Sequence, residues 1–243
     1  MNRKSPLGFP AKLFGLQVGW IFLLLIAHLV TQSRSVLLGQ SIETGQGLSQ
    51  LFNLDNEVNL PAWYSSCALF LCALLLGLIA AAPTRNGHEK SRYGWLGLSL
   101  IFFFLSLDEA ISIHEGLIPG LLSRLDNLPF MANYDWTIFG GLFVVVVAAG
   151  YFRFWLRLPS ATRLLFAVAM VVFVAGAIGF EKVSHFYEAK YQTENTIAYV
   201  VTCGIEEFLE MIGVALFTYG LLAHITQHVA GRLNLPLSVS NIN

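Results

Sequence analysis

Three short segments of the chain combine acidic residues with membrane-length apolar sequence. They read FLSLDEAISIHE from Phe104, FEKVSHFYEAKY from Phe180 and GIEEFLEMIG from Gly204. Carboxylates and imidazoles bind metal ions and transfer protons, so these segments are where chemistry is expected. A charge near the centre of a membrane helix costs about 2.5–3.5 kcal/mol, and these side chains therefore need a compensating interaction.

Helical spacing sorts the acidic residues and histidines onto faces, because residues i, i+3, i+4 and i+7 share one side of a helix. Each segment has one such stripe, and polar stripes should face the bundle interior or a water-filled cavity. We predict that these stripes supply six metal ligands, namely Asp108, Glu115, Glu181, His185, Glu206 and Glu210.

Five further residues lie beside these stripes or extend them, and we expect them to support the site or substitute for a ligand. They are Glu109, His114, Glu188, Glu207 and Tyr199. His114 is turned by about 110° from the stripe that contains Asp108 and Glu115. It is therefore a ligand only if the helix loosens before it.

So many carboxylates cannot all be ionised together without help. Two of them 5 Å apart repel by about 3 kcal/mol at an effective dielectric constant near 20. Either some stay protonated, which suggests proton or ion handling, or a multivalent cation neutralises them, which suggests a metal centre.

The excess of oxygen ligands over imidazoles favours iron or manganese as the metal. Four to six carboxylates with two histidines on facing helices match the ligand inventory of carboxylate-bridged di-iron sites in helical bundles. The usual Glu-x-x-His pair is absent, and Glu181-x-x-x-His185 stands in its place. A single zinc ion held by His114, His185 and one acid is the alternative, and it would imply hydrolysis of a lipid or peptide.

The elements that position these residues are expected to be membrane helices. The chain has 243 residues, of which 56% are hydrophobic and only 12% charged, as is typical of a polytopic membrane protein. Stretches of about 20 apolar residues span a bilayer. They occur near 13–32, 61–82, 93–113, 137–156, 163–185 and 198–223.

The sequence therefore predicts an all-α integral membrane bundle of six transmembrane helices in a single domain, residues 1–243, with extracytoplasmic loops at 33–60 and 114–136. The small residues of AGAIG, from Ala175, predict close helix packing in the fifth helix. The first of the two loops carries Asp55 and Glu57, and it is either a polar approach loop or a lid over the site.

Orientation follows from the basic residues, which are retained on the cytoplasmic side. In a six-helix arrangement ten of the fourteen lysines and arginines lie on the side of the termini, and of the fifteen acidic residues only Glu89 does. Both termini are therefore predicted to be cytoplasmic, and the acidic site extracytoplasmic, in what we expect to be a bacterial plasma membrane.

Composition and motifs exclude several function classes. The net charge of −1 leaves no basic excess for nucleic acid, and the three cysteines lack the spacing of a zinc knuckle. The sequence has no GxSxG, no phosphate-binding glycine loop and no HExxH.

Three functions remain as hypotheses. The first is a membrane metalloenzyme, an oxidoreductase or hydrolase, that modifies a lipid, quinone or other apolar molecule, and no residue is assigned a catalytic role in it. The second is a proton- or cation-coupled transporter or channel. The third is a non-catalytic subunit or assembly factor that docks a membrane protein partner. Intramembrane acidic residues are compatible with all three.

Overall fold

The computed structural model describes residues 8–42, 47–83, 89–113 and 136–230, and every element within these ranges is helical. In chain order the elements are α1 (Gly8–Leu37), α2 (Leu48–Leu51), α3 (Leu60–Ala81), α4 (Glu89–Ile111), α6 (Trp136–Leu156), α7 (Ser160–Val174), the π-helix η3 (Ala175–Phe180), α8 (Glu181–Tyr191), α9 (Ile197–His224) and the π-helix η4 (Ile225–Val229).

Six helices in the described residues are long and apolar enough to cross a membrane, which confirms the predicted all-α membrane bundle. The fifth consists of α7, η3 and α8, and the sixth of α9 and η4. The first, fifth and sixth helices extend several residues beyond the predicted stretches. Hydropathy detects only the apolar part of a helix, whereas the backbone hydrogen bonds continue into its polar ends.

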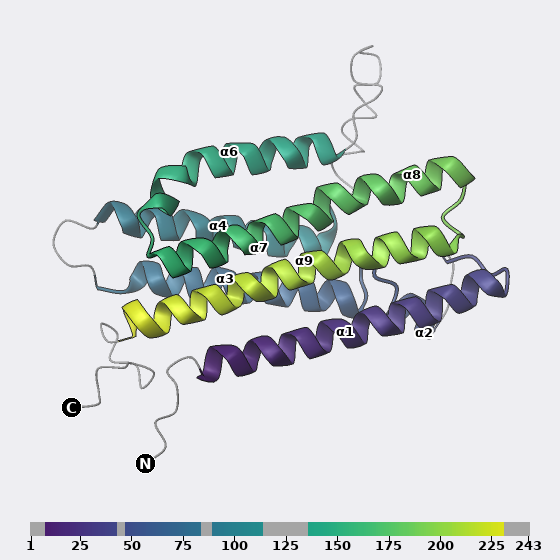
Figure 1. Cartoon of the computed structure of the whole chain (residues 1–243), viewed down its shortest axis with the longest axis horizontal. Helices are drawn as coiled ribbons and strands as arrows, with labels where there is room; N and C mark the ends of the chain where they lie inside the picture. Colours follow the sequence, from purple (N-terminus) through teal and green to yellow (C-terminus); the bar gives the residue numbers. More distant parts are fainter. Residues whose placement is uncertain (1–7, 43–46, 84–88, 114–135, 231–243) are drawn as a thin grey trace, which may run out of the picture.

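The helices lie side by side along the long axis of the molecule, with α9 at the centre (Figure 1). α9 packs against α1, α3, α7, η3 and α8, while α4 packs mainly on α3 and α6 lies at the edge. Within the most apolar window of each span, 61% of the residues in the sixth span are buried and none in α6. The side chains of α9 are therefore the ones that the other helices surround.

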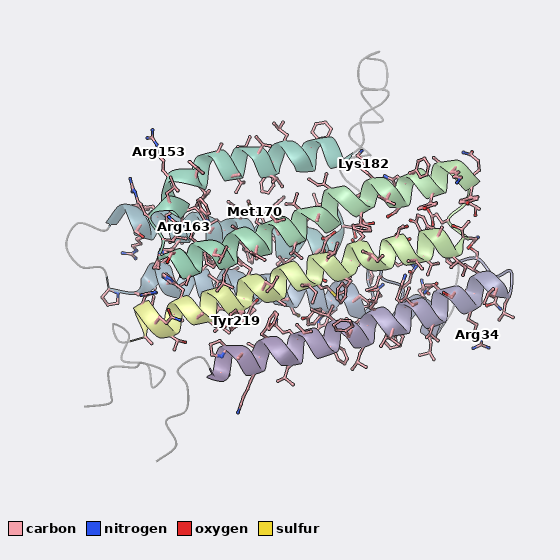
Figure 2. All side chains as sticks on the ribbon, in the orientation of Figure 1. Arg34, Arg153, Arg163, Met170, Lys182 and Tyr219 are labelled. Atoms are coloured by element: carbon pink, nitrogen blue, oxygen red, sulfur yellow. The ribbon has the colours of Figure 1, made fainter. Side chains whose placement is uncertain are left out.

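The bundle has two ends, named here by the turns that lie there. α1 begins and η4 ends at the α6–α7 end, and the turn between α8 and α9 marks the opposite, α8–α9 end (Figure 1). Arg153 and Arg163 project at the α6–α7 end, and Arg34 projects at the other (Figure 2).

A closely packed apolar core fills the half of the bundle toward the α6–α7 end. Leu76 of α3 and Leu221 of α9 are completely buried. The ring of Phe217 stacks on Phe102 with 4.6 Å between centroids and lies 4.5 Å from the ring of Phe166. Aromatic pairs of this kind stabilise a core beyond the area they bury.

The fifth helix approaches α9 closely at two glycines. A Cβ atom on Gly213 would lie 2.8 Å from the backbone nitrogen of Phe173, and one on Gly176 would lie 2.6 Å from the carbonyl oxygen of Glu206. Gly176 belongs to AGAIG, so the close packing predicted for that segment is present there. The same segment forms the π-helix η3, whose wider turns change the direction in which later side chains point.

Candidate carboxylate site

Acidic side chains from three helices and one loop lie within electrostatic range of one another in the half of the bundle toward the α8–α9 end. Glu109 and Glu206 act on both Glu207 and Glu210, Glu210 also acts on Glu207, and the other charges that act on these two residues are carboxylates as well. We call the group the carboxylate cluster. Its members are Glu109 of α4, Glu181 of α8, Glu206, Glu207 and Glu210 of α9, and Asp55 and Glu57 of the loop between α2 and α3.

The α9 wall of the cluster begins at a well-formed helix start. Thr196 caps α9, and its hydroxyl accepts a hydrogen bond from the backbone nitrogen of Tyr199 at 3.1 Å. Glu206 and Glu210 follow one helical turn apart and share a face, as predicted. A Cβ on Gly176 would lie 2.9 Å from Cγ of Glu210, so the backbone of η3 lies directly against these two acids.

Ser184 of α8 is a member of the site that the sequence analysis missed. Its side chain is 4% exposed, and its hydroxyl donates a hydrogen bond to Oε2 of Glu206 at 2.6 Å. Ser184 lies three residues after Glu181 and so shares its face of the helix, which is the signal in the sequence that could have identified it.

The loop between α2 and α3 enters the cluster through Asp55. The hydroxyl of Tyr199 lies 3.0 Å from Oδ1 and 3.2 Å from Oδ2 of Asp55, and Sγ of Cys203 donates to Oδ1 at 3.2 Å. Asp55 in turn acts electrostatically on Glu207. Tyr199, expected to support helix-borne ligands, is bound instead to a loop carboxylate.

His28 of α1 holds this loop in place. It is 1% exposed, and its Nδ1 accepts from the backbone nitrogen of Leu54 at 3.0 Å while its Nε2 donates to the carbonyl oxygen of Val200 at 3.0 Å. A ring with one accepting and one donating nitrogen is neutral. His28 therefore links α1, the loop and α9 without supplying a positive charge.

The structure describes five of the six predicted ligands. Glu181, Glu206 and Glu210 lie in the carboxylate cluster. His185 is 45% exposed, and its Nε2 is 4.0 Å from Oε1 of Glu181. Asp108 is half-buried on α4, and Glu115 lies outside the described residues.

Among the supporting residues, Glu109 and Glu207 lie in the cluster itself. Glu109 follows Ser106 by three residues, and the buried Ser106 hydroxyl donates to the carbonyl oxygen of Ser66 on α3 at 2.9 Å. Packing on α3 therefore turns the face of Ser106 and Glu109 inward. Asp108, two residues after Ser106, falls on another side of α4.

The end of α4 bears on the expectation for His114. α4 ends at Ile111, and Ser112 has a φ of 54°, a left-handed conformation that interrupts the helix. His114 itself lies outside the described residues, so its part in the site stays a prediction.

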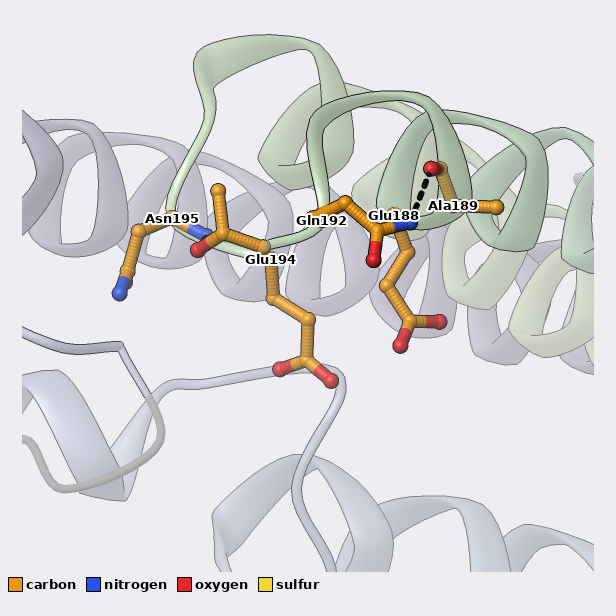
Figure 3. A pocket seen from close by; sticks show the side chains of 6 residues that line it. Glu188, Ala189, Gln192, Glu194 and Asn195 are labelled. Carbon is orange, nitrogen blue, oxygen red and sulfur yellow. Dashed lines mark hydrogen bonds between the residues drawn. The ribbon is translucent and has the colours of Figure 1, made fainter.

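Glu188 lies beside the turn between α8 and α9 (Figure 3). It lines an open polar depression together with Ala189, Gln192, Thr193, Glu194 and Asn195. The side-chain nitrogen of Gln192 donates to the carbonyl oxygen of Ala189 at 2.7 Å (Figure 3). The depression is thus formed by the turn that connects the two helices.

The described acids and histidines do not form a complete set of ligands for a metal ion. Within the described part of the chain, no group of three His, Cys, Asp or Glu side chains is arranged so that it could hold a metal ion. The carboxylate cluster is therefore a loose group of like charges, and any metal would have to draw its members closer.

A family model described as Domain of unknown function (DUF8692) matches residues 18–225. The chain belongs to this family. No curated protein and no solved structure matches the chain. All members of the carboxylate cluster fall within the matched range, so they belong to the part of the chain that the family model describes.

Proposed function

We propose that the protein is a membrane metalloenzyme whose carboxylate cluster binds a transition metal, iron or manganese in preference to zinc, and which modifies a lipid, quinone or other apolar molecule. One observation carries this proposal. The charges that act most strongly on Glu207 and Glu210 are all carboxylates, contributed by α4, α8, α9 and the loop before α3.

Mutual repulsion among these groups favours a bound multivalent cation. Two ionised carboxylates 5 Å apart would repel by about 3 kcal/mol at an effective dielectric constant near 20. The neutral His28 does not offset that repulsion. A divalent metal ion would neutralise several carboxylates at once, and oxygen-rich ligand sets suit iron and manganese.

The surroundings of the cluster favour an apolar substrate. Phe104 and Leu107 are exposed on the same part of α4 as Glu109, and Val183 and Phe186 are exposed on α8 between Glu181 and Glu188. Because α4 and α8 belong to helices long and apolar enough to span a membrane, we expect these exposed side chains to face lipid. A substrate dissolved in the membrane would reach them without crossing water.

A transporter is less well supported by the packing of the other half of the bundle. Between the cluster and the α6–α7 end lies the core of Leu76, Phe166, Phe217 and Leu221. An ion pathway would need polar groups or water through this region. An acidic site that the apolar core closes off from the α6–α7 end is better suited to binding a substrate than to carrying ions through the bundle.

Elemental analysis of the purified full-length protein, prepared without chelator, tests the proposal. We expect about one or more equivalents of iron or manganese per chain, and a clear loss of metal in Glu210→Gln and Glu181→Gln. Glu194→Gln, in the depression at the α8–α9 end, is the matched control and should retain metal. Less than one equivalent in the wild type, or unchanged metal in Glu210→Gln, would overturn the proposal.

A further inference from the structure

Three arginines flank the turn between α6 and α7. Arg153 lies in the last turn of α6, Arg157 directly after its end and Arg163 in the first turn of α7. Within the part of the chain that the structure describes, none of the three forms an ion pair. The sequence from 136 to 180 contains no aspartate or glutamate, and Glu89 is the one acid predicted for this side of the membrane. Most of the counter-charge for these arginines therefore has to come from outside the protein.

The side chain of Arg163 is already held in place. Its guanidinium carbon lies 5.6 Å from the centre of the Trp155 ring, and its Nη1 donates to the carbonyl oxygen of Leu156 at 3.2 Å. Trp155 in turn donates from Nε1 to the carbonyl oxygen of Arg163 at 3.0 Å. These contacts keep the guanidinium of Arg163 beside the backbone that leads to Arg157.

Most of the donors of Arg163 remain available to an anion. A guanidinium has five N–H donors in a planar fork that matches the geometry of phosphate oxygens. The hydrogen bond to Leu156 is the one that the Arg163 side chain donates within the described residues. Because the side chain is held beforehand, it would lose little further conformational freedom on binding a phosphate group. We call Arg153, Trp155, Arg157 and Arg163 the arginine turn.

The arginine turn lies where two membrane spans end. These spans run over Phe139–Leu156 and Ser160–Tyr191, so Arg157 lies between them. Lipid headgroups lie at the ends of membrane spans, and acyl chains lie beside the apolar side chains within them. Phe152 is 55% exposed and Leu164 66% exposed, just inside the two spans. Arginines at headgroup level beside exposed apolar side chains match an anionic phospholipid in both charge and polarity.

We infer that the arginine turn binds the headgroup of an anionic phospholipid, with Arg157 and Arg163 in contact with its phosphate. Trp155 is a positioning residue that orients Arg163. Arg153 is exposed one turn inside the span, and its long side chain extends toward the headgroups. The inference is independent of the proposed function, because the carboxylate cluster lies toward the opposite end of the bundle.

Native mass spectrometry of the full-length protein in a neutral detergent tests this inference. The probes are phosphatidylglycerol and phosphatidylcholine with the same acyl chains. We expect phosphatidylglycerol to bind at least about tenfold more tightly, since one arginine near an anionic membrane surface is worth about fivefold in affinity. Equal affinities for the two lipids would overturn the inference. Displacement of the lipid by an equal concentration of inorganic phosphate would also overturn it, because the ligand would then be a free anion.

Three variants separate a headgroup site from a diffuse positive field. Arg163→Gln should weaken phosphatidylglycerol binding by about five- to tenfold. Arg163→Lys keeps the charge but loses the planar fork, and it should weaken binding by at least about threefold. Trp155→Phe loses the N–H donor and the stronger cation–π contact, and it should weaken binding by about two- to fivefold. Wild-type affinity in Arg163→Lys would overturn the inference, because charge alone would then explain the binding.

Two matched controls remove one positive charge elsewhere. Lys12→Gln changes α1, which begins at the same end but lies across α9 from α6 (Figure 1). Arg34→Gln changes the α8–α9 end (Figure 2). Both should bind phosphatidylglycerol as the wild type does, and thermal unfolding should show that all variants are folded. A loss in Lys12→Gln equal to that in Arg163→Gln would overturn the inference. Failure of the metal test at the carboxylate cluster would leave it in place.

Discussion

The packing of Ser106 decides which face of α4 turns toward α3. Ser106 is buried against α3, where its hydroxyl is bound to the carbonyl oxygen of Ser66. Glu109, one turn later, acts electrostatically on Glu207 and Glu210, and Asp108 lies about 100° from it around α4. The two acids should therefore differ in their importance for metal binding.

Substituting these two acids one at a time gives a matched test of that difference. We expect Glu109→Gln to reduce Mn²⁺ affinity at least about tenfold more than Asp108→Asn does, because Glu109 acts electrostatically on both Glu207 and Glu210. Titration of the detergent-solubilised protein measures both. Equal losses, or a greater loss in Asp108→Asn, would show that α4 presents a different face to the site.

At the scale of elements, the π-helix η3 gives the fifth helix its contact with the acidic turn of α9. Single π turns inside α-helices are frequent at functional sites because they redirect side chains. Here η3 lies immediately before Glu181, and its Gly176 touches the backbone of Glu206. The position of Ser184, which binds Glu206, follows from this close approach.

Replacing either of two glycines in η3 by alanine should change the free energy of unfolding in opposite directions. Gly176→Ala would place a Cβ 2.6 Å from the carbonyl oxygen of Glu206, and displacing that backbone should cost about 1–3 kcal/mol of unfolding free energy. Gly179→Ala meets no heavy atom within 4 Å and should be neutral or slightly stabilising, since alanine favours helices over glycine.

Thermal unfolding in detergent, followed by circular dichroism, measures both glycine variants. The prediction for η3 would be contradicted if Gly176→Ala unfolded at the wild-type temperature, or if Gly179→Ala were the more damaging change.

At the scale of the whole molecule, the arrangement of the charges predicts the orientation in the membrane. Arg153 and Arg163 lie at the α6–α7 end, where α1 begins and η4 ends, and the carboxylate cluster lies toward the opposite end (Figures 1 and 2). Basic residues are retained in the cytoplasm. The α6–α7 end should therefore be cytoplasmic and the cluster extracytoplasmic.

Cysteine labelling in intact cells tests this orientation. Thr193→Cys, in the turn between α8 and α9, should react with a membrane-impermeant maleimide, and Ser160→Cys, at the start of α7, should react only after permeabilisation. The wild type, with its own three cysteines, is the control for background labelling. The reverse pattern would place the acids on the cytoplasmic side.

The sequence by itself determined the six membrane helices, and it predicted that the acids of three of them lie at a similar level. The length of an apolar stretch identifies a membrane helix. The position of an acid along that stretch predicts its level, because a helix rises by a constant distance per residue. Glu181, Glu206 and Glu210 were identified in this way, and the structure places them in one cluster.

Only the tertiary structure decided which neighbours complete the site. The inward direction of Glu109 depends on the packing of α4 against α3, the role of Ser184 depends on the wider turns of η3, and the entry of Asp55 depends on a loop fastened by His28. A regular angle of 100° per residue describes one straight helix. That angle contains no information on how helices cross, on a π turn or on a folded loop. These features decide which helix faces contact one another.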